Sequence, residues 1–337
     1  MRKSLRVPRL VAALLVLGAC GIASAPAGIA VTRQAQPVPT VFIGDSYTAN
    51  FGVAPLNRAR LFCFQSQQSY PAVATERLAE RGIPLQVQAD VSCGGAVIHH
   101  VWEPQPLLIG QAKPQRDALK EDTELVVGSM GGNTAGFAEI MKQCSERLRG
   151  PEGNLLPAEP VNAEWPAAEC QDFFENGEGA NWLKERFDTV RADLDRMFDE
   201  IRTRAPLSET VLVGYPRIVP EDTAKCLENI PGGDDTPLAD IGQEALRFLD
   251  KQIQEPLDNL MRESAEANNA HFAGLYRHTG GNTACDGEDR GIGAMLETSE
   301  IGLVPGSKLP WFVHPNRVGR DVQAAVVTDT IEQTLRP

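Results

Sequence analysis

The sequence is short of positive charge. Its 337 residues include 32 lysines and arginines against 45 aspartates and glutamates, which gives a formal net charge of −13. Loss of an N-terminal leader carrying Arg2, Lys3, Arg6 and Arg9 would bring the charge from −13 to −17. Proteins that bind nucleic acid need a basic surface to neutralise phosphates. We therefore expect no nucleic-acid partner, and the acidic balance fits a protein kept soluble outside the cell.

The apolar run from Leu10 to Gly18 is too short to span a bilayer. It follows four cations and precedes a segment rich in alanine, glycine and proline, which is the pattern of a secretory signal peptide. We expect residues 1–30 to form this signal and the mature chain to be secreted, with no transmembrane span. Two cleavage routes fit the pattern: a lipoprotein box at Leu17-Gly18-Ala19-Cys20, which would leave a lipid anchor on Cys20, or ordinary small-residue sites at Ala23-Ser24-Ala25 and Gly28-Ile29-Ala30.

The sequence has no C-x-x-C spacing, and its cysteines are spread along the chain, so a structural zinc site is not expected. Either cleavage route takes Cys20 out of the fold. An even number of cysteines in an oxidising compartment predicts three disulfides, and the residues alone leave all fifteen pairings open. The six that remain are Cys63, Cys93, Cys144, Cys170, Cys226 and Cys285.

Short apolar runs alternate with helical patterns along the chain. The runs, expected to be strands, are 40–43, 85–89, 125–128, 210–214 and 272–276, and the helices are expected at about 70–81, 135–148, 182–204, 242–268 and 318–335. This alternation predicts a parallel sheet of about five strands covered on both faces, hence a three-layer α/β/α sandwich of the doubly wound kind. With no internal repeat and no composition break, we expect one domain over residues 38–337.

Three segments interrupt this rhythm and are poor in core-forming residues: 150–180, 218–238 and 280–310. We expect long loops here. Because each contains or adjoins cysteines, a covalent tie is the expected physical means of limiting their freedom.

Ser46 stands in Gly44-Asp45-Ser46, directly after the first predicted strand. The carboxyl ends of parallel strands open onto the ligand crevice of such a sheet, so a serine there is well placed to react. Read by itself, the triplet also fits a turn or a helix N-cap. The sequence lacks the G-x-S-x-G nucleophile elbow of the α/β-hydrolases, because Thr48 occupies the second glycine position.

A serine hydroxyl needs a base within hydrogen-bond reach to act as a nucleophile. The chain has only five histidines. Of these, His314 lies in Trp311-Phe312-Val313-His314-Pro315, a loop before the last predicted helix, from which an imidazole could reach the sheet edge. The other four are in turns or at a strand end and are read as structural or surface residues: His99, His100, His271 and His278.

Acyl transfer also needs hydrogen-bond donors aimed at the oxyanion that develops on the substrate. The Cys93-Gly94-Gly95-Ala96 turn after the second strand supplies backbone that can approach a ligand closely. Gly131-Gly132-Asn133 after the third strand adds a side-chain amide. Each segment taken alone is also compatible with an ordinary turn.

Taken in order, these segments resemble the blocks of the SGNH (GDSL-type) hydrolases: a GDS serine, a glycine, a GxN asparagine and a C-terminal DxxH histidine. The resemblance runs from about Pro39 to the end of the chain. It implies Ser46 as nucleophile, His314 as general base, and an oxyanion hole made by the amides of Ser46 and Gly95 and the side chain of Asn133. Gly95 is preferred to Gly94 because it directly precedes Ala96, two places after the cysteine, as in secreted disulfide-bonded members of the family.

The resemblance also implies that neighbouring cysteines pair in order, as in secreted bacterial members with three disulfides. Carried over to this chain, the pairs are Cys63–Cys93, Cys144–Cys170 and Cys226–Cys285.

Two positions depart from the family pattern. Trp311 stands where the pattern places the aspartate of the triad, and Thr134 stands where many relatives have an aspartate after the asparagine. An indole cannot accept a hydrogen bond from the imidazole, so another oxygen must orient His314. The main-chain carbonyl of Trp311 is the simplest candidate and gives a Ser-His dyad, as in some secreted relatives; Asp45 and Asp122 are the competing carboxylates.

The resemblance implies a secreted serine esterase or lipase that forms an acyl-enzyme without a metal or organic cofactor. The expected partner is a small-molecule or lipid ester, and the expected state is a monomer. Two alternatives stay open at this point: an acetylesterase acting on extracellular polysaccharide, and a catalytically weak binding protein on the same scaffold.

Overall fold

Five short apolar segments form one parallel sheet in the computed structural model, which describes residues 36–156, 160–304 and 306–336. The signal peptide expected at residues 1–30, including Cys20, lies outside the described residues. Along the sheet the order is β2-β1-β5-β6-β7. The strands are β1 Val38–Phe42, β2 Leu85–Asp90, β5 Leu125–Gly128, β6 Glu209–Val213 and β7 His271–Ala273, all within two residues of the predicted starts.

The strand order reverses beside β1. From β1 the chain moves outward to β2, then returns to the other side of β1 to form β5, and continues outward to β6 and β7. The connections that leave β1 and β5 therefore diverge, which opens a crevice at the carboxyl ends of these two strands. Ser46 follows β1 and Asn133 follows β5, so both predicted blocks lie at this reversal.

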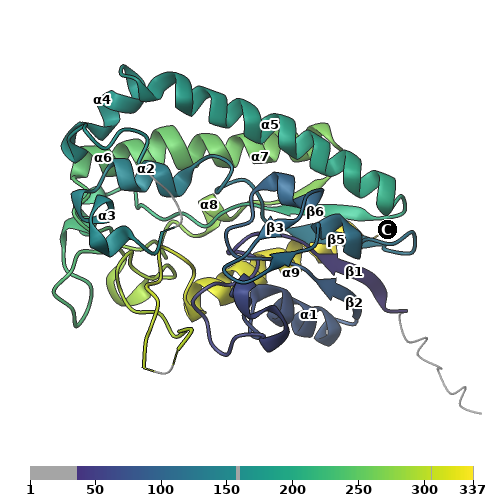
Figure 1. The fold of residues 1–337 in the computed structure, drawn as a ribbon. Helices are drawn as coiled ribbons and strands as arrows, with labels where there is room; N and C mark the ends of the chain where they lie inside the picture. The colour runs from purple at the N-terminus through teal and green to yellow at the C-terminus, as the bar shows by residue number, and fades with distance from the viewer. Residues whose placement is uncertain (1–35, 157–159, 305, 337) are drawn as a thin grey trace, which may run out of the picture. The chain divides into compact units, whose positions relative to one another are not determined.

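Alternate strand residues face opposite layers of helices, as expected for a sheet buried on both sides. Phe42, Val127 and Val211 pack with α1 (Tyr70–Glu80) and α9 (Arg317–Leu335). Val41, Val126 and Leu212 pack with α5 (Gly179–Arg204) and α7 (Glu255–Ala267). Figure 1 shows these two helix pairs on the two sides of the sheet. The predicted α/β/α sandwich with a five-stranded parallel sheet is confirmed.

Shorter elements fill the connections. The helices are α2 Phe137–Gln143, α3 Glu146–Arg149, α4 Cys170–Glu175, α6 Gln243–Phe248 and α8 Leu275–His278. A small antiparallel hairpin joins β3 Gln105–Pro106 to β4 Gln111–Ala112. Turns of 3₁₀ helix are η1 Arg58–Cys63, η2 Ile98–Val101, η3 Gln115–Ala118, η4 Pro151–Gly153, η5 Ala167–Glu169, η6 Thr223–Leu227 and η8 Gly287–Asp289, and η7 Leu249–Gln254 is a π-helix.

Three predicted elements differ in detail. The helix expected at 135–148 is interrupted at Cys144, because Ser145 accepts a hydrogen bond from Leu148 N–H and starts α3. The strand expected to reach residue 276 ends at Ala273, and Leu275 begins α8. The helix expected at 242–268 runs through α6, the π-helix η7 and α7. The π-helix ends at Gln254, two residues before Pro256, which has no N–H for the helical hydrogen bonds.

The three long loops have a hydrophobic core of their own, away from the sheet. It includes Phe173, Phe174 and Phe248, all nearly inaccessible to solvent, together with Ile218 and Ile301 from the loops. Two of the three disulfides, Cys144–Cys170 and Cys226–Cys285, lie in this cluster, and Cys63–Cys93 ties η1 to the turn after β2. These are the pairs that the family resemblance implies. The covalent ties compensate for the poor core-forming composition of the loops.

Among the helices of the described residues, none is both long and apolar enough to cross a membrane.

We predict that removing the disulfide with the longest sequence separation weakens the fold. In the double variant Cys226→Ala/Cys285→Ala, no disulfide links the two positions, 59 residues apart, in the unfolded chain. The free energy of unfolding should fall by about 2–4 kcal/mol, measured by urea denaturation followed by circular dichroism. Peptide mapping without reduction provides the check on the pairing: a peptide that joins Cys93 to Cys144 would contradict it.

Candidate active site

The turn after β1 holds Ser46 at the crevice. Gly44 has φ +146°, and a Cβ atom there would lie 2.2 Å from Thr48 Oγ1, so only glycine fits. The Thr48 hydroxyl in turn accepts a hydrogen bond from Ser129 N–H at 2.9 Å, which joins the turn to the end of β5. Thr48, which replaces the second glycine of the G-x-S-x-G pattern, therefore fixes the turn from within.

Gln115 clamps the same turn from outside. Its Oε1 accepts from Gly44 N–H at 2.7 Å, and its Nε2 donates to the Gly44 carbonyl at 2.9 Å. Gln115 is 3 % exposed, so both hydrogen bonds are shielded from water. A buried two-point contact of this kind leaves the backbone before Ser46 little freedom.

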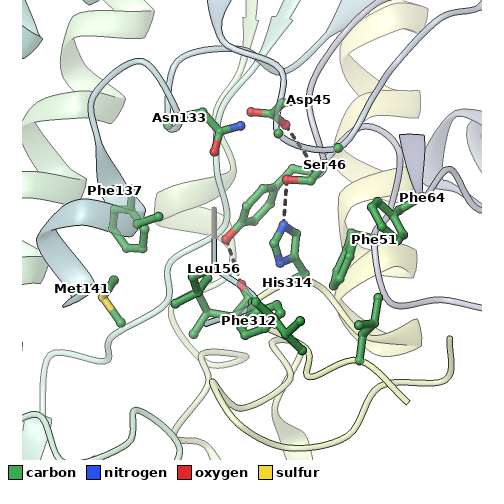
Figure 2. A pocket seen from close by; sticks show the side chains of 18 of the residues that line it. Asp45, Ser46, Phe51, Phe64, Asn133, Phe137, Met141, Leu156, Phe312 and His314 are labelled. Atoms are coloured by element: carbon green, nitrogen blue, oxygen red, sulfur yellow. Dashed lines mark hydrogen bonds between the residues drawn. The ribbon is translucent and has the colours of Figure 1, made fainter. Parts of the chain in front are cut away.

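His314 faces Ser46 directly, with Nε2 at 2.7 Å from the serine Oγ (Figure 2). Its other ring nitrogen, Nδ1, lies 2.9 Å from the Trp311 carbonyl oxygen. A carbonyl can only accept, so Nδ1 carries the proton in the neutral ring. Nε2 is then an acceptor, and the Ser46 hydroxyl donates to it. The geometry thus sets the tautomer that a general base needs.

The loop before His314 is wound tightly to bring that carbonyl within reach. Phe312 and Val313 have φ +48° and +54°, a left-handed conformation that is uncommon for bulky and β-branched residues. The Tyr47 hydroxyl donates to the Val313 carbonyl at 2.8 Å. The buried Trp311 ring anchors the loop start against Gly52 and Gly293, where a Cβ atom would come within 2.4 Å and 2.1 Å of the indole.

His314 is partly buried between aromatic rings. The ring centroids of Tyr47 and Phe51 each lie 4.8 Å from its own. Burial, only partly offset by the hydrogen bond to the Trp311 carbonyl, lowers the pKa of His314 to about 4. A neighbouring carboxylate would instead raise the pKa.

Neither competing carboxylate orients His314. Asp122 is exposed and accepts from Gln88 Nε2 at 3.1 Å. Asp45 is buried and accepts from Tyr47 N–H and from the Tyr215 hydroxyl. Burial raises the pKa of Asp45 to about 7, against the lowering effect of these hydrogen bonds.

The Tyr215 hydroxyl joins two turns of the site. While it donates to Asp45, it accepts from Gly132 N–H at 2.8 Å. Asp45 precedes Ser46, and Gly132 precedes Asn133. Tyr215 therefore connects the serine turn after β1 to the asparagine turn after β5 through one buried phenol.

The glycine and asparagine blocks meet across the crevice. Asn133 Nδ2 donates to the Ala96 carbonyl at 2.9 Å. The Thr134 hydroxyl, at the position where many relatives have an aspartate, accepts from Ile98 N–H at 2.9 Å. Two adjacent residues of the asparagine turn thus hold the loop that carries Gly95.

The remaining histidines stay apart from this cluster. The rings of His99 and His100 meet edge to face in η2. His271 lies 3.5 Å from Glu209, and His278 bonds the Gly274 carbonyl. No atom of these four residues lines the cavity described next.

Ser46, His314, Gly95 and Asn133 line one cavity of about 570 Å³. Polar groups gather at the end where Ser46 and His314 meet, and Figure 2 shows apolar side chains around the rest of the space. These include Phe51, Phe64, Phe137, Met141, Leu156 and Phe312. The cavity can therefore hold an apolar group of the size of a small molecule beside the serine.

Several residues with a part in this geometry were not identified from the sequence, among them Tyr47, whose hydroxyl holds the Val313 carbonyl. Tyr215 lies two residues beyond the end of β6, at the same sheet edge as Ser46 and Asn133. Its position after a predicted strand could therefore have identified it. Gln105, which lines the cavity, comes from a two-residue strand, and Gln115 comes from a 3₁₀ turn. Neither has a periodic or motif signal.

The chain is similar to known esterases and lipases in sequence and in fold. The model of the GDSL-like lipase/acylhydrolase family matches residues 42–322. An esterase of Streptomyces scabiei is 54% identical over 99% of this chain and 98% of its own length. Among solved structures, an extracellular lipase of Streptomyces rimosus superposes with a TM-score of 0.60 at 19% identity, covering 87% of this chain and 99% of the other. A phospholipase A1 of Streptomyces albidoflavus gives 0.59 at 20% identity over 88% and 100%.

The family match spans all four blocks found in the sequence, from the serine turn to the histidine loop, and the related esterase covers nearly the whole chain. The two structures show the same fold. The chain belongs to the GDSL-like lipase/acylhydrolase family and is an ester hydrolase of the SGNH type.

Proposed function

We propose that the chain hydrolyses carboxylic esters through an acyl-enzyme on Ser46. The observation that carries the proposal is the 2.7 Å contact between Ser46 Oγ and His314 Nε2, with the proton of the neutral ring held on Nδ1. A hydroxyl that donates to an unprotonated imidazole nitrogen is the arrangement that activates a serine nucleophile.

The reaction follows from these positions. His314 Nε2 takes the hydroxyl proton while Ser46 Oγ bonds to the ester carbonyl carbon, and the carbonyl oxygen becomes an oxyanion. The backbone N–H groups of Ser46 and Gly95 and the Asn133 side-chain amide stabilise that charge. His314 then gives its proton to the departing alcohol. Water, activated in the same way, releases the acid and restores the serine.

In this proposal the Trp311 carbonyl orients His314 without contributing a full negative charge. The imidazolium formed during acylation keeps its hydrogen bond from Nδ1 to that carbonyl. The pairing is a Ser-His dyad rather than a triad.

The cavity favours an ester with an apolar acyl or alcohol group. Its wall is mostly phenylalanine, leucine and methionine, which matches a hydrocarbon chain and offers few partners for the hydroxyls of a sugar. Proteins similar to this chain include an esterase, a lipase and a phospholipase A1, which fit this substrate class. We therefore favour lipid or short-chain acyl esters over acetylated polysaccharide. Three disulfides fit a role outside the cell, where we expect the protein to be secreted.

Ser46→Ala should lower kcat by several powers of ten, because it removes the nucleophile. Hydrolysis of p-nitrophenyl butyrate measures the loss, and a fluorophosphonate probe should label the unaltered protein on Ser46 only. Ser208→Ala is the matched control, since its hydroxyl bonds the Ala205 carbonyl before β6, away from the cavity. A folded Ser46→Ala protein with full hydrolysis would rule out the proposal.

The pH dependence of kcat/KM should show an acid limb near pH 4. His314 acts as a base only when neutral, so activity is present above its pKa of about 4 and is lost as the pH falls through it. The rate of p-nitrophenyl butyrate hydrolysis, read at a wavelength where p-nitrophenol absorbs equally in both protonation states, measures this, with circular dichroism at each pH. Asp45→Asn should leave the limb in place; a limb near pH 7 that this substitution removes would assign it to Asp45 instead.

Trp311→Phe should retain activity within roughly tenfold, because the carbonyl that holds His314 belongs to the backbone, while His314→Ala should be nearly inactive. The smaller ring loosens the packing on Gly52 and Gly293, so the melting temperature should fall.

Asp45→Asn and Asp122→Asn test the dyad against a carboxylate partner of His314. A loss of about 10⁴-fold in kcat in either folded variant, the size expected for a triad aspartate, would refute the dyad.

A further inference from the structure

The turn that carries Gly95 can exist in two orientations. Ala96 N–H donates to the Cys93 carbonyl at 3.1 Å, which closes a β-turn with Gly94 and Gly95 at its centre. Gly95 has φ +74°, the value of the third residue of a type II turn. Type I and type II differ by a flip of the central peptide, here the Gly94 carbonyl and the Gly95 N–H. Because both central residues are glycines, no Cβ atom selects between them.

One side chain holds this peptide in its observed orientation. Gln105 Nε2 donates to the Gly94 carbonyl oxygen at 2.7 Å. The carbonyl and the N–H of a trans peptide point in opposite directions, so the Gly95 N–H points away from Gln105. A flipped peptide would turn the N–H toward Gln105 and reverse the direction of the proposed oxyanion donor.

Gln105 lines the cavity, and its side chain makes one hydrogen bond, to the Gly94 carbonyl. It is 5 % exposed at the start of β3, and within the described part of the chain its Oε1 is buried without a hydrogen-bond partner. The reverse amide assignment would place Oε1 against the Gly94 carbonyl, two acceptors facing each other. The buried amide therefore makes its one hydrogen bond to the peptide that carries the oxyanion donor.

We infer that Gln105 is a positioning residue that locks the Gly94–Gly95 peptide so that the Gly95 N–H faces the reacting carbonyl. The inference rests on the proposed function, in which Gly95 supplies an oxyanion donor. Gln105 acts through the backbone and needs no contact with the reacting atoms. Since the oxyanion exists only in the transition state and the intermediates, Gln105 contributes to kcat and little to KM.

Gln105→Met keeps the length of the side chain and removes the donor. We expect kcat to fall by about 10- to 100-fold with KM nearly unchanged, less than the roughly 10²–10³-fold loss for removing a donor itself, as in Asn133→Ala. Affinity for a phenylboronic acid that mimics the tetrahedral intermediate should fall with kcat. Gln323→Met is the matched control: Gln323 is also buried, with its Nε2 unpartnered among the described residues, and it bonds Asn50 outside the cavity lining.

Gln105→Glu should make kcat depend on pH in a way that a purely structural role of Gln105 would not. At neutral pH its carboxylate repels the Gly94 carbonyl, and after protonation the carboxyl can donate to it. Burial raises a carboxyl pKa, so the introduced carboxylate should begin to protonate well above the pH at which protonation of His314 abolishes activity. The ratio of kcat for Gln105→Glu to that of the unaltered protein should therefore rise as the pH falls from 8 to 5, while the ratio for Gln105→Met stays flat.

Two results would overturn the inference: a kcat for Gln105→Met within twofold of the unaltered protein, or a Gln105→Glu ratio that stays flat with pH. If Gln105→Met fails to fold, the pH series of Gln105→Glu decides. Failure of the proposed function looks different, because Ser46→Ala would then remain active. An inactive Ser46→Ala protein beside a fully active Gln105→Met protein rejects the inference about Gln105 alone.

Discussion

The site depends on one hydrogen bond, from His314 Nδ1 to the Trp311 carbonyl. It sets the tautomer of the imidazole, and with it the acceptor nitrogen that faces Ser46. A backbone oxygen can take this role only if the chain between the two residues turns back sharply, which Phe312 and Val313 achieve in left-handed conformations. Such conformations persist where the surroundings over-determine them. Here the Tyr47 hydroxyl, the Trp311 ring and the two glycines beneath that ring hold the loop.

The rest of the proposed catalytic site is built from turns joined to one another by buried polar side chains. Gln115 and Thr48 fix the serine turn, Tyr215 joins it to the asparagine turn, and Asn133 and Gln105 hold the glycine turn. Turns lack the regular backbone hydrogen bonds that make helices and strands rigid. Preorganised donors, however, stabilise a transition state only if they need not move when charge develops. The side-chain contacts supply the rigidity that the secondary structure lacks.

The apolar end of the cavity comes from the loops outside the sheet. Leu156, Ile218, Leu309 and Phe312 line the cavity from segments that the sequence shows only as irregular. These segments are stabilised by their own hydrophobic cluster and by two disulfides rather than by the central sheet. The sandwich therefore positions the proposed reacting groups, and the disulfide-linked loops form the apolar part of the cavity.

The sequence by itself determined the fold class and the order of the blocks. Its strands and helices follow from hydrophobic periodicity, which is local, and Gly44-Asp45-Ser46 and Asn133 are adjacent to strands that parallel pairing brings to one edge. It also indicated the Trp311 carbonyl, because an imidazole needs an acceptor and the family aspartate is absent. Only the tertiary structure decided that Asp45 bonds Tyr215 and that Gln105 reaches Gly94, since these partners are 170 and 11 residues apart in irregular segments. Contacts between turns produce no periodic pattern in the sequence, because packing and burial determine which turns meet.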